Sequence, residues 1–237
     1  MIIRDKKLFA KGALLMLSFT AVFILIFSPV FPGGVNGLHF SDDLFNKLSK
    51  GSSYFIPEVV KSVKPYDGKQ VAVDVKMKSP EDVKTAVLLL DKVGAKGEAK
   101  GDVVTVTADL GLMLGKVTAD ADLLYKDDFD KLNAAYGMDG KVAMKGWWTL
   151  LNAMIKPLQK NKLIEEASVV NTVNQKAIEP AYNFAGIPAE SIGTKIPTVA
   201  ALLVFYVIYT MWYGYAIFDM FAGMGLSMSK SKIKKEA

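Results

Sequence analysis

The sequence predicts a membrane protein in which two transmembrane α-helices flank one mixed α/β extracytoplasmic domain. Two uncharged apolar runs, 12–31 and 196–218, predict the helices. An apolar run of about 20 residues can cross a hydrocarbon core of roughly 30 Å as a helix, which satisfies its own backbone hydrogen bonds. Between the runs, a strand pattern, a capped helix and a second strand pattern follow one another, which predicts a β-α-β core.

The predicted segments follow from the apolar runs and the charges beside them. Arg4, Lys6, Lys7 and Lys11 precede the first run, more lysines follow the second, and the middle carries about as many lysines as acids. Since cytoplasmic flanks are rich in Lys and Arg, both termini are expected in the cytoplasm and the central domain in the periplasm or outside the cell. The segments are a cytoplasmic N-terminus 1–11, a first span 12–31, the domain with juxtamembrane helices 32–195, a second span 196–221 and a basic cytoplasmic tail 222–237.

The N-terminal run is interpreted as a permanent anchor of the cell (inner) membrane. A basic N-terminus followed by an apolar run is also typical of a signal peptide. This run, however, is longer than the usual 7–15-residue core of a signal peptide, and the PVFPGGVNG that follows offers no A-x-A-like cleavage site.

The first half of the domain carries the clearest local signals. Residues 41–64 are expected to be helical, and 69–78 alternates apolar and polar residues as a half-buried strand does. Ser79 and Pro80 then predict a helix start, with serine as N-cap and proline at the first helical position. That helix is expected to end at Gly94, and a second strand is expected at 102–107.

The second half is expected to be mainly helical. Residues 110–136 fit an apolar helical stripe, although 117–123 also alternates as a strand would, and the helix is favoured. The aromatic stretch 145–156 is expected to be interrupted at Pro157. A longer helix is expected at 158–184, with Pro180 as the place of a kink.

The composition excludes several kinds of site. With no cysteine in the chain, thiolate metal sites, Cys-ligated clusters and Cys nucleophiles are excluded for this chain alone. The single histidine, His39, has no Glu-x-x-His or His-x-x-x-His partner. Phosphate-binding glycine loops and the GxSxG and SxxK motifs are absent in the right context. No catalytic residue, metal or cofactor is therefore predicted, and the basic residues lie beside the predicted membrane rather than in a nucleic-acid-binding patch.

The chain carries one dense acidic cluster. A pair of carboxylates can serve glycosidic chemistry, and a cluster can bind Ca²⁺. The run lacks the spacing of a calcium-binding loop and is interleaved with lysines, so a solvated helix face is favoured. The residues are Asp120, Asp122, Asp127, Asp128 and Asp130.

The second span carries more aromatic and methionine surface than contact with lipid requires. Because Tyr O–H and Trp N–H groups in lipid need partners, this face is predicted to pack on another helix, either the first span or a different protein. Asp219 lies about 34 Å along the helix from Ile196, near the cytoplasmic interface, and is expected to pair there with Lys11. The predicted interface residues are Tyr206, Tyr209, Trp212, Tyr213, Met220 and Met224.

Trp147 and Trp148 are candidate membrane-surface anchors, and filling the core of the domain is the equal alternative.

The sequence is compatible with three functions. The leading hypothesis is a non-catalytic accessory or scaffold subunit of a larger integral membrane complex, with other membrane subunits and the bilayer as partners and homo-oligomerisation as an alternative. The second is an anchored extracytoplasmic module that binds or senses a ligand. A membrane enzyme or transporter component ranks third, since two spans are few for a transport path.

Overall fold

The computed structural model describes residues 3–226, and the chain divides into two compact units. One unit combines the described parts of Met1–Leu48 and Glu190–Ala237, and the other is Ser49–Ala189. From residue 227 onward the predicted basic tail 222–237 lies outside the described residues.

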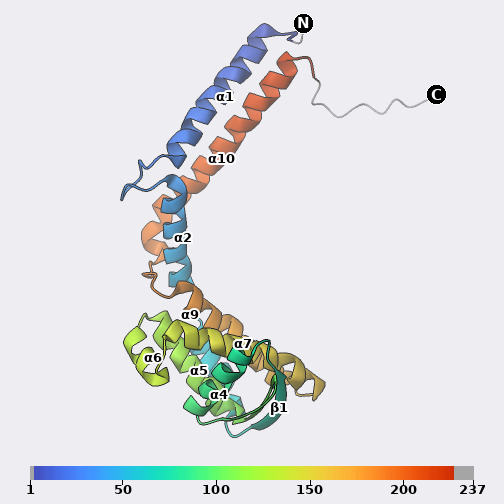
Figure 1. The fold of residues 1–237 in the computed structure, drawn as a ribbon. Coiled ribbons are helices and arrows are strands. Elements are labelled where there is room, and N and C mark those ends of the chain that lie inside the picture. The colour runs from blue at the N-terminus through green and yellow to red at the C-terminus, as the bar shows by residue number, and fades with distance from the viewer. Residues whose placement is uncertain (1–2, 227–237) are drawn as a thin grey trace, which may run out of the picture. The chain divides into compact units, whose positions relative to one another are not determined.

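The first unit is built on an antiparallel pair of long helices, here called the apolar hairpin. They are α1 (Lys6–Phe27) and α10 (Ile192–Gly223), which run side by side (Figure 1). Both are long and apolar enough to cross a membrane. Their buried residues are few and small or polar: Gly12 in α1, and Ala216, Asp219 and Gly223 in α10.

Local capping explains where α1 begins. The Asp5 carboxylate accepts hydrogen bonds from the backbone N–H groups of Lys7 and Leu8, each at 3.0 Å, so the helix starts at Lys6, before the predicted span 12–31. The N–H groups of Arg4 and Asp5 both donate to the carbonyl of Gly223 at 2.9 Å, which ties the start of α1 to the end of α10.

The predicted helix 41–64 is two helices. They are α2 (Gly37–Ser52), within which the two units divide, and α3 (Ile56–Val63), followed by the 3₁₀ turn η1 (Lys64–Tyr66).

The sheet of the second unit has three strands, β1 (Gln70–Lys76), β2 (Lys96–Lys100) and β3 (Val103–Asp109), in the order β1-β3-β2. Both pairings are antiparallel, with Val73 opposite Val106 and Gly97 opposite the same residue. The predicted second strand, 102–107, is β3, which pairs directly and antiparallel with β1, and β2 was not predicted. With β2 included the unit is a split β-α-β: β1 and β2 are parallel to each other, but β3 lies between them. The alternating valines of β1 form its buried face, as the sequence predicts.

The helix α4 (Pro80–Lys92) follows the predicted start signal. The Ser79 hydroxyl accepts from the Asp82 N–H at 3.1 Å and donates to the Asp82 carboxylate at 2.8 Å, so serine is the N-cap. Gly94 follows the helix with a φ of +78°, a conformation that glycine adopts without strain.

The region 110–136 is helical, as favoured. It forms α5 (Leu110–Tyr125), which follows β3 directly with Asp109 as N-cap, and α6 (Phe129–Tyr136). The strand alternative for 117–123 is wrong. Val117, Ala121 and Leu124 are fully buried and lie on one helical face.

The predicted interruption at Pro157 is also wrong. Helix α7 (Gly140–Lys160) continues through Pro157 and ends only before Lys162, which has a φ of +63°. Beyond it come α8 (Ile164–Val173), a π-helical segment η2 (Asn174–Ile178) and α9 (Glu179–Phe184). Pro180 has no N–H to offer the carbonyl of Lys176 four residues earlier, so the irregularity predicted here is a widened π turn just before the proline.

The core of the second unit lies between the sheet and its helices. Helices α4 and α7 pack against each other and against the sheet. The largest fully buried side chains include Trp147, Leu89, Leu90, Leu110 and Met144.

Candidate functional site

The seam of the apolar hairpin is built from close backbone approach. A Cβ at Gly12 would lie 2.5 Å from the Met220 backbone nitrogen, and one at Gly223 would lie 2.6 Å from that of Phe9. Glycines at these two places let the helices touch, and close approach of this kind is typical of helix pairs in membranes.

Two of the predicted interface aromatics pack within the hairpin. Phe19 of α1 stacks on Tyr209 with ring centroids 4.2 Å apart and contacts Tyr213 at 5.1 Å. Phe205 stacks on the same Tyr209 at 5.4 Å. For Tyr209 and Tyr213, therefore, the first span is a helix partner. Tyr206 is 65% exposed and makes no ring contact of this kind in the described chain.

The two predicted interface methionines, Met220 and Met224, lie at the C-terminal end of α10. Met220 is against Gly12, since a Cβ there would meet its Cγ at 2.8 Å. Met224 is half-buried and caps the helix.

Lys11 and Asp219 form the predicted pair. The Lys11 ammonium lies 2.9 Å from Asp219 Oδ2, although that oxygen has no partner in hydrogen-bond geometry. Asp219 is 5% exposed, whereas most of the lysine side chain is accessible. The pair thus neutralises a carboxylate that α10 buries in the seam.

A groove runs along one flank of the seam and is here called the hairpin groove. Its volume is about 540 Å³. Four of its residues recur at helical spacing on α10 and two recur on α1, so each helix supplies one stripe. The lining is Lys11, Leu15, Ile208, Met211, Trp212 and Tyr215. In the described chain, neither the buried Trp212 Nε1–H nor the buried Tyr209 hydroxyl has a hydrogen-bond partner.

The two neighbouring tryptophans of α7 separate. Trp147 is fully buried, and its Nε1–H donates to the Tyr136 hydroxyl at 2.7 Å, so it fills the core and cannot anchor the domain on a membrane surface. Trp148 is 39% exposed, and its Nε1–H donates to Glu179 Oε1 at 2.8 Å.

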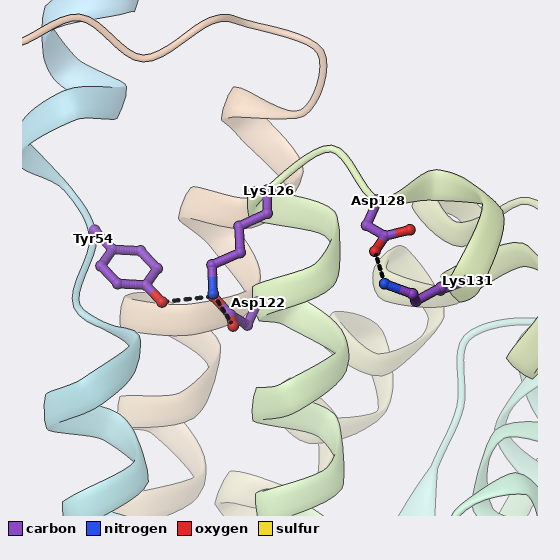
Figure 2. Close-up of polar contacts among 5 residues, drawn as sticks. All are labelled: Tyr54, Asp122, Lys126, Asp128 and Lys131. Atoms are coloured by element: carbon purple, nitrogen blue, oxygen red, sulfur yellow. Dashed lines mark hydrogen bonds and ion pairs between the residues drawn. The ribbon is translucent and has the colours of Figure 1, made fainter.

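Lysines and a tyrosine engage two members of the acidic cluster (Figure 2). Asp122 lies 2.6 Å from the Lys126 ammonium and accepts from the Tyr54 hydroxyl at 2.8 Å. Asp128 pairs with Lys131 at 2.6 Å. These two carboxylates belong to local i,i+4 and i,i+3 pairs where α5 ends and α6 begins, as a solvated surface predicts. The prediction of one solvated helix face does not hold for Asp120, which is half-buried, or for Asp127, which lies in the turn between the two helices.

Asp127 ties together the places where the chain enters and leaves the second unit. Its carboxylate lies 2.7 Å from the buried Lys50 ammonium and accepts from the Gly186 N–H at 2.6 Å. The Tyr125 hydroxyl donates to the Lys50 carbonyl beside it. We infer a structural role for Asp127.

Asp120 begins a chain of hydrogen bonds that leads from the half-buried carboxylate into the core. It accepts from the Tyr136 hydroxyl at 2.6 Å, and that hydroxyl in turn accepts from Trp147. Burial raises the pKa of Asp120, while Tyr136 and the charge of Lys116 act in the opposite direction. Burial and the nearby Asp120 carboxylate strongly raise the pKa of Tyr136.

The second unit contains a cleft of about 310 Å³ between α7 and the η2–α9 segment, here called the domain cleft. Ile178 is fully buried, and the partly exposed rings of Trp148 and Tyr182 also line it. Its residues are Lys145, Trp148, Ile178, Glu179, Tyr182 and Asn183. Among residues 3–226, no three His, Asp or Glu side chains come together as a metal-binding group.

Sequence reasoning missed the domain cleft. The sequence points to Trp148, but its neighbours in the cleft come from residues 178–183, for which the sequence predicts only the inward-facing and kinked part of a long helix. The i,i+4 repeat of Ile178 and Tyr182 was the available signal, but it does not say which helix faces it.

Comparison with known proteins gave no relative. No family model matches this sequence, and neither the curated proteins nor the solved structures gave a match. The functional argument therefore rests on the geometry of the two units.

Proposed function

We propose that this protein is a non-catalytic accessory subunit of an integral membrane complex, and that the hairpin groove receives a transmembrane helix of a partner subunit. The supporting observation is the groove itself, which lies on a hairpin whose only buried residues are in its seam.

The groove has the features of a helix-docking surface. Ile208, Met211 and Tyr215 lie three and four residues apart along α10. Side chains at this spacing form the rows against which the ridge of a second helix can pack. Methionine adapts to irregular partners, so Met211 suits such a contact. An acyl chain could fill the same space. The buried Trp212 N–H does not distinguish the two occupants, because it is not open to the groove, and the cross-linking described below does.

The orientation belongs to the same proposal. Arg4, Lys6, Lys7 and Lys11 gather at the start of α1, which supports a cytoplasmic N-terminus in the inner membrane and a periplasmic α/β domain. Because the chain has no cysteine, a single Ser53→Cys variant can be probed with a membrane-impermeant maleimide in intact spheroplasts. Labelling supports the orientation, and labelling only after lysis contradicts it.

Photo-cross-linking in the native membrane tests the docking. A benzophenone amino acid is placed at Met211, which is 52% exposed in the groove, and at Leu203, which is 59% exposed on the same helix but outside it. A discrete adduct with another membrane protein at Met211, absent at Leu203, is expected. Adducts with lipid alone, or with a second copy of this chain, would overturn the proposal of a partner subunit.

The domain cleft favours a second function, that of a ligand-binding module. It does not depend on the hairpin, since all its lining residues belong to the unit Ser49–Ala189.

A further inference from the structure

Two segments of the chain form the walls of the domain cleft. From α7 come Lys145 and Trp148, and from the η2–α9 segment come Ile178, Tyr182 and Asn183. A volume of about 310 Å³ is at the lower end of the range of small-molecule sites, roughly 300–1,000 Å³. The size suits one small organic molecule.

The apolar part of the cleft favours a flat ring. Trp148 and Tyr182 are 39% and 36% exposed, so part of each ring is available, and Ile178 adds a buried aliphatic surface. Aromatic rings attract one another in stacked or edge-to-face arrangements beyond what buried area alone gives. A planar aromatic body would therefore be held better than a branched aliphatic one of the same size.

The charges of the cleft favour an anion. The Glu179 carboxylate already accepts from the Trp148 indole, whereas the Lys145 ammonium has no ion-pair or hydrogen-bond partner in the described chain. A second cation, Lys141, lies one turn earlier on α7 with its ammonium 5.4 Å from the centre of the Tyr182 ring. The lining thus carries one lysine without a partner and one carboxylate that keeps its charge but is bonded to the indole, and Lys141 adds positive charge beside the lining.

One wall of the cleft is formed in part by an irregular stretch of helix. The π-helical segment η2 ends at Ile178, and π turns inside helices occur often at functional sites. Asn174, fully buried in this segment, donates from its side-chain amide to the Trp148 carbonyl at 3.2 Å and joins the two walls. Its Oδ1 is buried without a partner in residues 3–226, so the segment keeps an unpaired acceptor that a regular core avoids.

We propose that the domain cleft binds a small aromatic carboxylate, with its ring against Trp148 and Tyr182 and its carboxylate at the Lys145 ammonium. Asn183 supplies an amide at the same rim. Binding is non-covalent and needs no other reactant.

The test uses the full chain in nanodiscs, labelled with 5-fluorotryptophan. The protein has three tryptophans, so the fluorine spectrum has three resonances, and Trp148→Phe assigns the one of interest. The probes are indole-3-acetate and tryptamine, which share a ring and carry opposite charges. We expect indole-3-acetate to shift the Trp148 resonance saturably and to bind about threefold to fivefold more tightly than tryptamine, the preference that one exposed ion pair gives.

Two variants locate the charge preference. Lys145→Gln is expected to remove it, and Lys156→Gln, an exposed lysine of α7 outside the cleft, is expected to keep it. The proposal is overturned if neither probe shifts the Trp148 resonance, if both bind equally to the unmodified chain, or if the two variants behave alike. A shift of the Trp212 resonance alone would indicate partition into the lipid and would also refute it.

Discussion

Replacing Tyr136 with phenylalanine tests how far the α/β domain depends on the chain of hydrogen bonds from Asp120 to Trp147. The Tyr136 side chain is 3% exposed, and its hydroxyl accepts from Trp147 at 2.7 Å and donates to Asp120 at 2.6 Å. Tyr136→Phe keeps the ring but leaves the fully buried indole N–H without this acceptor.

The expected loss in the free energy of unfolding is large for the removal of one oxygen atom. An unsatisfied buried donor costs about 1–3 kcal/mol, and the lost bond to a partly exposed carboxylate adds roughly 1 kcal/mol. The sum, about 2–4 kcal/mol, corresponds to a fall of roughly 6–15 °C in the melting temperature of a unit of this size.

The pH dependence of that loss follows from Asp120. Burial raises its pKa in the folded state, so its contribution to stability is fully present below its unfolded pKa, near 4, and is lost as the pH rises through the folded value. The bond from Tyr136 lowers that pKa, and without it the pKa rises further. The difference in stability between the two proteins should therefore be smaller at pH 4 than at pH 7.

Near-ultraviolet circular dichroism of the full chain in detergent follows this unfolding. The matched control is Tyr66→Phe, whose hydroxyl donates to the Glu165 carbonyl at the surface at 3.3 Å and whose loss should shift the melting temperature by less than about 2 °C. A Tyr136→Phe protein that melts within 2 °C of the original at pH 7, or no lower than the control, would refute the reasoning.

Two further changes test the seam of the hairpin and one ion pair of the domain. Gly12→Leu should force α1 and α10 apart, because its Cβ would lie 2.5 Å from the Met220 nitrogen, whereas Gly214→Leu meets nothing within 4 Å. Spin labels at Leu17→Cys and Val207→Cys should report a longer or broader distance in the first variant alone, and unchanged distances in both would contradict the seam. Lys69 lowers the pKa of the buried Glu166, so this carboxylate contributes stability above its unfolded pKa and loses it as the pH falls through the lower folded value. Glu166→Gln should therefore lose less stability than the original between pH 5 and pH 3, with the exposed Glu98→Gln as control, and equal acid slopes for all three would count against a role for the pair.

Local patterns predicted the elements whose causes are local. The alternating valines of β1 and the Ser79 cap of α4 depend on neighbours within a few residues, and both are confirmed. Strand β2 was missed because its sequence, KGEAK, has little apolar alternation, and it forms by pairing with β3. The prediction of an interruption at Pro157 was wrong. An interior proline usually ends a helix, yet here α7 continues to Lys160, and Leu158 is fully buried.

The sequence alone determined two apolar segments long enough for a membrane, a strand–helix–strand core and the absence of cysteine chemistry. These follow from composition and short periodicities, which act along the chain. Only the tertiary structure decided that Trp147 is core and Trp148 lines a cleft, that Phe19 covers Tyr209, and that Asp127 holds the domain's two chain ends. Each of these depends on which residues distant in sequence meet in space, and a single sequence carries no direct record of that.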